Sequence, residues 1–437
     1  IPVMAPDGSF AAMSSGDGRI RLWNNQQGQD KWHEVALVPE LIGVPIEALC
    51  FVPKEPVLLV AWSTGAVGRI DTAHVWTEDG AGRPIDGEPP HTVAPGSAPL
   101  QRMAWGEQTG FVRKTFARDY PKLVWPPPEI LRRGAPHPTS QRAPDTSPRS
   151  VAAFSGDGRR VAIFEEHGKG GDSRRELAVY DVSDLAATPS SVRLEGEVLI
   201  APDAMTRNEY DISVSASGDR VALAYGSKQA YVFDVGAQTL QTVEHDAAVT
   251  VVAISSAGDR VISGSIDGQV LFSRPGSEER LERNHQGRIW RAAFDATGAK
   301  AVTTSTDRTA RIWRFEGDIP KKVGHRLHHR HTINGVAFSG DGKTIVTTSQ
   351  DLTARVWDAE TSRRLGAPLP HRGRVWAAAM DDRAEHILTT SWAGEGKIWS
   401  PESGSRCRHW FTYGHDAVAA AISEDGERVL TAGDGVK

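Results

Sequence analysis

The chain has 437 residues, with 50 Lys and Arg against 55 Asp and Glu, which gives a formal net charge of −5 at pH 7. This length corresponds to two or three ordinary domains or to one repeat architecture, and the near balance of charge excludes a broad electrostatic nucleic-acid binder. Hydrophobic residues make up 39% of the chain, with 43 Gly and 26 Pro, which is too apolar for a disordered chain and too rich in helix breakers for long helices.

The first third of the chain predicts irregular repeats. Residues 1–145 contain three repeat starts, near residues 1, 46 and 98, and we expect the first and the last repeat of the chain to be truncated. The longest apolar run, residues 57–62, is far too short to span a membrane, so we expect no membrane segment. A proline-rich stretch near 125–149 is predicted to be a linker or a long loop.

Residues 151–437 predict seven clearer repeats, which start near residues 151, 210, 248, 288, 333, 374 and 418. Asp307 and Asp351 lie 44 residues apart, as do Trp313 and Trp357. Apolar and polar residues alternate with period two, and Asp-Gly or Gly-Asp pairs supply the positive φ that tight hairpins need. Each repeat therefore predicts a four-stranded antiparallel sheet, which must pack radially against its neighbours to bury both faces.

The repeats resemble WD40 repeats in their loop histidine, their Ser-x-Asp turn and their terminal Trp. The residues that carry the resemblance include Ser305-Thr-Asp307 with Trp313-Arg314, Ser349-Gln-Asp351 with Trp357-Asp358, and Gly414-His415. The resemblance implies an all-β, WD40-type β-propeller of four-stranded antiparallel blades, with about ten repeat units. Because propellers usually have four to eight blades, ten units favour parts of two propellers over one wider ring.

The resemblance also implies a hydrogen-bonded structural tetrad in each blade. A buried imidazole, carboxylate, hydroxyl and indole must satisfy one another, at a cost of about 1–3 kcal/mol for each orphaned group. The recurrence of His, Asp and Ser in every blade argues against a catalytic triad, because an enzyme needs one site. The tetrads are predicted at His285, Asp307 and Trp313 with Thr303 or Ser305, and at His331, Asp351 and Trp357 with Thr347 or Ser349.

Residues at the start of the innermost strands ring the top face of such propellers, and these are the predicted partner-binding positions. Arg and Trp are the residue types most enriched in interface hot spots. The alternative is that the tryptophans pack between blades. The candidates are Arg288, Trp290, Asn334, Arg374, Trp376 and Trp392.

The histidine-rich run at 325–331 could suggest a metal site. Zinc needs three or four ligands in fixed geometry, and this run has neither Cys nor a carboxylate nearby in the sequence. A solvated basic loop is the simpler interpretation. We expect no metal, no cofactor and no catalytic residue in this chain.

These features favour a non-catalytic scaffold or sensor module that mediates protein–protein interaction within a larger signalling or regulatory protein. The expected partners are a protein or peptide on the top face and other domains of the same chain. Two alternatives stay open: a stable structural subunit of a multiprotein assembly, and a hydrolase-like propeller with a site in the central channel. High Ala, Arg and Gly usage resembles bacterial WD40 arrays, including the sensor regions of STAND-type signalling proteins. The presence of only two cysteines fits a cytoplasmic location.

Overall fold

The computed structural model describes residues 2–5, 10–14, 20–24, 31–35, 46–52, 57–62, 67–71, 149–167, 174–182, 189–194, 210–277, 280–400, 406–412, 417–422 and 429–433. These residues form strands and turns, and none of them is helical. The described part of the chain therefore has no helical segment that could cross a membrane. The predicted all-β fold is confirmed.

The chain divides into two compact units. Apart from the first eight residues, one unit holds Ser9–Glu195 and the other Gly196–Lys437. The division thus falls later than the boundary at 145–151 that composition suggested, because the sheet that begins at Arg149 groups with the N-terminal part. The repeat start near residue 98, and all but the last residue of the proline-rich stretch at 125–149, lie outside the described residues.

Three antiparallel sheets precede residue 195. The first has strands β1 (Pro2–Met4), β2 (Phe10–Ser14), β3 (Ile20–Asn24) and β4 (Lys31–Val35). The second has β5 (Ile46–Phe51), β6 (Val57–Trp62) and β7 (Val67–Asp71). The third has β8 (Arg149–Phe154), β9 (Arg160–His167), β10 (Arg174–Asp181) and β11 (Ser190–Leu194). Every residue of β6 is buried, as its apolar run predicts.

Six sheets follow in the second unit, and the strands of each pair in chain order. The first two contain β12 (Asp211–Val214), β13 (Arg220–Ala224), β14 (Gln229–Asp234) and β15 (Thr239–Glu244), then β16 (Val249–Ile254), β17 (Val261–Ser265), β18 (Val270–Ser273) and β19 (Arg280–Glu282). The next two contain β20 (Ile289–Phe294), β21 (Lys300–Ser305), β22 (Thr309–Glu316) and β23 (Ile319–His328), then β24 (Ile333–Phe338), β25 (Thr344–Ser349), β26 (Thr353–Asp358) and β27 (Arg364–Pro370). The last two contain β28 (Val375–Met380), β29 (Ile387–Ser391), β30 (Glu395–Ser400) and β31 (Arg406–Thr412), then β32 (Ala417–Ile422) and β33 (Val429–Gly433).

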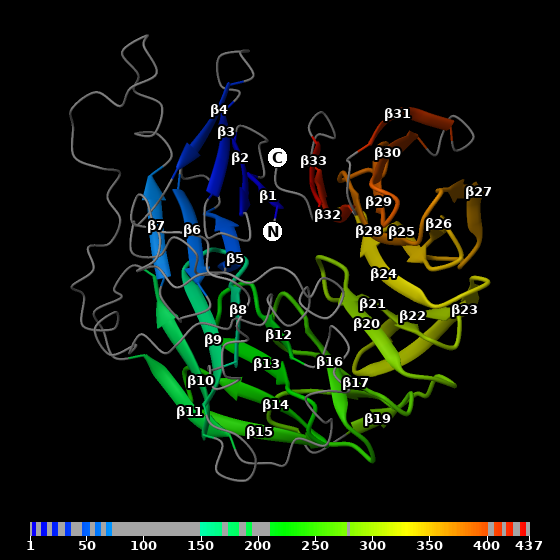
Figure 1. The fold of residues 1–437 in the computed structure, drawn as a ribbon. Helices are drawn as coiled ribbons and strands as arrows, with labels where there is room; N and C mark the ends of the chain where they lie inside the picture. Colours follow the sequence, from blue (N-terminus) through cyan, green and yellow to red (C-terminus); the bar gives the residue numbers. More distant parts are fainter. Residues whose placement is uncertain are drawn as a thin grey trace, which may run out of the picture. The chain divides into compact units, whose positions relative to one another are not determined.

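The sheets of the second unit pack face to face in sequence, with the first strands of successive sheets side by side. Figure 1 shows them following one another along the chain from green to red. Apolar clusters lie at the four junctions from the sheet β12–β15 to the sheet β28–β31: one joins Phe272 of β18 to Trp313 of β22, and another joins Val346 of β25 to Trp399 of β30. This radial packing is what the period-two pattern requires, because each sheet has two apolar faces to bury. The described residues form nine such sheets along the chain.

Tight turns and inter-sheet hydrogen bonds fix one end of these sheets. Gly258 has φ +73°, and its amide donates to the Ser255 carbonyl at 2.8 Å, so the turn needs a residue that tolerates the left-handed region. Basic side chains then bridge from one sheet to the next turn. Arg220 Nη1 donates to Gly258 O, Arg260 Nη1 to Gly298 O and Lys300 Nζ to Gly342 O, each at 3.0 Å. These bonds fix the angle between neighbouring sheets.

Candidate functional site

A hydrogen-bonded network closes the sheet β20–β23 at its other end. His285 Nδ1 lies 3.0 Å from Asp307 Oδ2, and His285 Nε2 lies 2.9 Å from Thr303 Oγ1. Trp313 Nε1 donates to the same Thr303 oxygen at 3.0 Å. One proton arrangement satisfies every atom: the indole donates to the threonine, the threonine to the imidazole, and Nδ1–H to the carboxylate. Thr303 is the hydroxyl member, and Ser305 instead donates to the Gly287 carbonyl at 2.8 Å.

The next sheet, β24–β27, repeats this network with His329, where the sequence suggested His331. His329 Nδ1 lies 3.0 Å from Asp351 Oδ2, and Nε2 lies 2.8 Å from Thr347 Oγ1, which accepts from Trp357 Nε1 at 2.8 Å. The assignment of His331 to this tetrad is therefore wrong, because that residue is exposed. The physical reason is that β23 continues to His328, so the chain turns into the sheet at the following residue.

The sheet β28–β31 builds an equivalent network with a carboxylate that sequence reasoning missed. His371 Nε2 lies 2.7 Å from Thr389 Oγ1, which accepts from Trp399 Nε1 at 2.7 Å. Ala393 occupies the position of the turn aspartate, and Glu395 reaches back from the first position of β30. Glu395 Oε2 accepts the Arg372 amide at 2.8 Å and lies 3.5 Å from His371 Nδ1. Glu395 stands two residues after the position of the turn aspartate, and its longer side chain compensates for this shift.

Burial keeps these imidazoles neutral. Burial lowers the pKa of His285 and His329, and the neighbouring carboxylates raise it only in part. The pKa of His371 is lowered to about 4 by burial and by the Lys397 charge. Burial alone would raise the pKa of Asp307 and Asp351, but hydrogen bonds from the histidines, threonine hydroxyls and backbone amides hold it well below its usual range. A neutral, buried imidazole recurs in three successive sheets, hydrogen-bonded on both nitrogens in the first two and through Nε2 in the third, and this repetition indicates a structural role.

The predicted partner-binding positions lie at the same end of the sheets as these networks, on recurrent β-bulges. The pairing register shifts between Ile289 and Arg291, between Ile333 and Gly335, and between Val375 and Ala377. The intervening residues are Trp290, Asn334 and Trp376. A bulge leaves the extra residue outside the regular ladder and redirects its side chain, and bulges are frequent near functional sites. The same backbone irregularity therefore places a tryptophan at two of these equivalent positions and an asparagine at the third.

Three of the six candidates form one group held by aromatic stacking and a cation–π contact. The rings of Trp376 and Trp392 stack with centroids 5.2 Å apart, and the Arg374 guanidinium lies 5.4 Å from the Trp392 ring. Arg374 is exposed and both tryptophans are half-buried. The Trp392 amide donates to the Arg374 carbonyl at 3.0 Å, which fixes this turn against the strand. The result is a stacked Arg-Trp-Trp group at the rim of the sheet β28–β31.

The remaining three candidates differ in how deeply they are buried. Arg288 lies 5.3 Å from the Trp290 ring, and both residues are half-buried. Asn334 is only 2% exposed, so it cannot act as a partner contact. Its amide nitrogen donates to the Val375 carbonyl of the next sheet at 3.2 Å, and its oxygen accepts from Gln350 at 3.2 Å. Asn334 therefore positions the neighbouring strand, and its inclusion among the binding residues is corrected.

Two exposed apolar side chains occupy the same turns and escaped sequence reasoning. Ile266 is 40% exposed and Leu352 is 42% exposed. Leu352 has φ +67°, a left-handed conformation that bulky residues rarely adopt, and the equivalent turn positions are Arg308 and Gly394. The turn requires this left-handed backbone conformation. The exposed leucine side chain that it carries adds apolar area to the rim. With the arginine and tryptophan groups, these residues define what we call the rim surface: Ile266, Arg288, Trp290, Leu352, Arg374, Trp376 and Trp392.

The histidine-rich run does not assemble a metal centre in the part of the chain that the structure describes, where no group of three or more His, Cys, Asp or Glu side chains could hold an ion. Within that run, His329 is used by the tetrad, and His325, His328 and His331 are exposed.

Comparison with known families agrees with this architecture. The family model of the WD domain, G-beta repeat, matches residues 3–24, 237–272, 278–314 and 321–358. The third and fourth matches contain the tetrads of His285 and His329. No curated protein matches the chain. The chain therefore carries WD40 repeats at these four places, as its sequence pattern predicts.

Proposed function

We propose that this WD40-repeat chain is a non-catalytic β-propeller module that binds a protein or peptide through the rim surface of the sheets β16–β31. WD40 repeats are generally protein-interaction scaffolds. The observation that carries the proposal is the set of half-buried tryptophans with stacked arginines, placed by equivalent bulges on β20 and β28. The buried networks in the three sheets from β20 to β31 stabilise the sheets and so leave these rim positions free to vary.

The chemistry of the rim surface suggests what it binds. A tryptophan flanked by an arginine offers a large apolar area and a directed cation, a pair that is enriched in interface hot spots. The turns of the same sheets carry two exposed cations, Arg308 and Arg372, whereas Asp307 is engaged by His285. A segment with carboxylates next to apolar side chains would complement this surface.

The wider setting is also a proposal. We infer that the module acts as a scaffold or sensor within a larger signalling or regulatory protein in the cytoplasm. Free Cys50 and Cys407 are compatible with a reducing compartment, and the resemblance to bacterial WD40 arrays supports the signalling role.

The test compares two single tryptophan substitutions in affinity capture from the source cells. Trp376→Ala removes a stacked ring of the rim surface, and its backbone carbonyl would still accept from Thr348 Oγ1 at 3.1 Å. Trp410→Ala is the matched control, because Trp410 is 66% exposed on β31, away from the rim. A partner retained by wild type and Trp410→Ala but lost by Trp376→Ala, with all melting temperatures equal, supports the proposal. Equal capture by both variants, or a melting temperature lowered only in Trp376→Ala, refutes it.

A further inference from the structure

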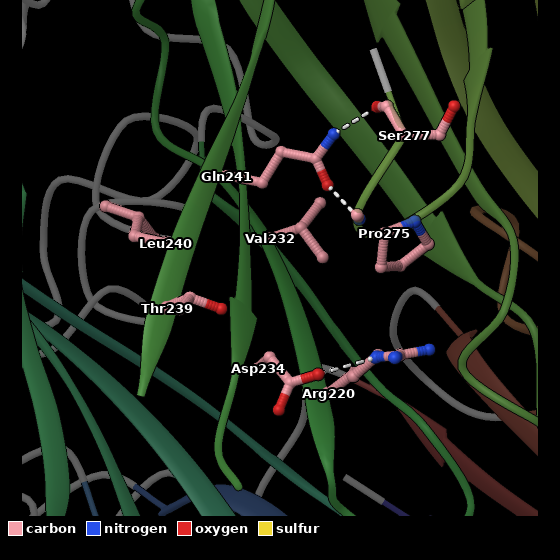
Figure 2. A pocket seen from close by; sticks show the side chains of 9 residues that line it. Arg220, Val232, Asp234, Thr239, Leu240, Gln241, Pro275 and Ser277 are labelled. Carbon is pink, nitrogen blue, oxygen red and sulfur yellow. Dashed lines mark hydrogen bonds and ion pairs between the residues drawn. The ribbon is translucent and has the colours of Figure 1, made fainter. Parts of the chain in front are cut away.

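A cavity of about 380 Å³ lies between the sheet β12–β15 and the turn that follows β18. Figure 2 shows Arg220, Asp234, Val232, Gln241 and Pro275 around it. Arg220 begins β13 and Asp234 ends β14. The cavity is therefore at the end of the sheets opposite the tetrads and the rim surface, and the exposed residues of the adjoining turns leave it open to solvent.

The next junction between sheets shows what fills the equivalent space. Val232 pairs with Ala222 as Phe272 pairs with Ile262, one repeat of 40 residues later. By the same offset, Pro275 corresponds to Phe315. At that next junction the rings of Phe272 and Phe315 meet edge to face, with centroids 5.8 Å apart. The cavity therefore exists because a valine and a proline stand where the following repeat has two phenylalanines.

The arginine hydrogen bond that lies beside Phe315 in the next junction is nevertheless present beside the cavity. Arg260 Nη1 donates to Gly298 O at 3.0 Å, and its guanidinium lies 4.9 Å from the Phe315 ring centroid. Arg220 makes the equivalent 3.0 Å bond to Gly258 O and is further held by Asp234 at 3.1 Å. Among the described residues, no ring lies over Arg220. Its guanidinium is thus fixed as in the filled junction, next to an open space.

The opposite wall is fixed as well. Gln241 Oε1 accepts the Gly276 amide at 2.8 Å, and Nε2 donates to the Ser277 carbonyl at 2.6 Å, as Figure 2 shows. These bonds join β15 to the turn after β18, so the cavity is preformed. A preformed site loses little free energy to ordering when a ligand enters.

We propose that this cavity binds a phenylalanine or tyrosine side chain from an exposed segment of a partner protein. The ring would lie against Val232 and Pro275 and face the Arg220 guanidinium, as Phe315 faces Arg260 in the next repeat. Phe315 enters its site from the end of strand β22, where it pairs with Pro320 of β23, which makes a side chain delivered by an extended peptide backbone the closest analogue. An engineered cavity of about 150 Å³ holds a benzene molecule, so this volume admits a ring with adjoining backbone atoms.

The experiment titrates the whole chain with the blocked peptide N-acetyl-Gly-Phe-Gly-amide, followed by saturation-transfer NMR of the phenyl protons. Pro275→Phe restores the residue found in the next repeat and should weaken binding by about tenfold or more by occupying the site. Pro275→Ala is the matched control and should bind within about threefold of wild type, because it leaves the cavity open. Val232→Phe fills the site from the other sheet and should weaken binding in the same way, so the test does not depend on one variant folding.

Two further titrations test where the peptide binds and whether the aromatic ring is required. Trp376→Ala should bind the peptide as wild type does, which separates this site from the rim surface of the proposed function. The analogue N-acetyl-Gly-Leu-Gly-amide should bind more weakly, because a leucine offers no π face to the guanidinium. Equal binding of the phenyl peptide by wild type, Pro275→Phe and Val232→Phe overturns the proposal. Binding of free toluene without binding of the peptide also overturns it, because the site would then not accept a side chain from a partner.

Discussion

Thr347 is the position at which the tetrad can be tested most directly. The side chain is fully buried, and its single oxygen serves both the Trp357 indole and the His329 imidazole at 2.8 Å. Thr347→Val preserves shape and removes the hydroxyl, which leaves an indole N–H and an imidazole nitrogen without partners. At about 1–3 kcal/mol for each orphaned group, the variant should lose roughly 2–6 kcal/mol of unfolding free energy. Urea denaturation followed by tryptophan fluorescence measures this loss.

A matched control comes from a nearby sheet. Thr250 is also fully buried, but its hydroxyl has no hydrogen-bond partner among the described residues. Thr250→Val should therefore leave stability unchanged or raise it, because an unsatisfied buried hydroxyl is replaced by a methyl group. If Thr347→Val costs no more than Thr250→Val, the hydrogen-bonded network does not stabilise the sheet and the structural interpretation fails.

Three further predictions concern the same networks. His329→Ala should destabilise the chain by about 2 kcal/mol or more, while His331→Ala should change stability by less than about 0.5 kcal/mol; parallel urea titrations decide between the two registers. Glu395→Ala should cost about 1–3 kcal/mol, because the backbone amide and Lys397 lose their acceptor, and thermal unfolding will detect it. Stability should be greatest above pH about 6.5 and fall as the pH drops towards 4, because His371 has its pKa lowered to about 4 in the folded chain whereas the unfolded chain takes up the proton near its ordinary value. His371→Gln should flatten that pH dependence of the urea midpoint.

Much of the fold was predictable because it depends on local patterns. Strand alternation and turn pairs placed most strands of the second unit, and the spacing from Asp307 to Trp313 recurs from Asp351 to Trp357. These features recur because the hairpins and the tetrads need specific residue types at fixed positions. The repeated sequence pattern therefore predicted the sheet topology. It also predicted the carboxylate and indole members of the networks of His285 and His329.

The details that escaped prediction depend on backbone geometry that the residue pattern does not encode. Three histidines lie within four residues at the end of β23, and only the length of that strand decides which of them enters the sheet. Glu395 was missed because it occupies the position that Thr353 holds in the preceding repeat, and its longer side chain reaches the loop from there. Asn334 was misjudged because its burial follows from contact with the neighbouring strand at Val375.

The cavity near Pro275 shows a second limit of the same kind. A substitution such as Phe315 to Pro275 between repeats is visible in an alignment of the repeats, but its consequence is a volume, which depends on what the facing sheet supplies. Here the facing sheet supplies Val232 where the next junction has Phe272, so neither side fills the space, while Arg220 keeps its inter-sheet hydrogen bond. A repeat protein can therefore open a site by omitting two rings from one junction, because the hydrogen bonds that fix the angle between sheets are made by other atoms. The same separation operates at the rim, where the bulge and the network recur while the side chain on the bulge changes from Trp290 to Asn334 between successive sheets.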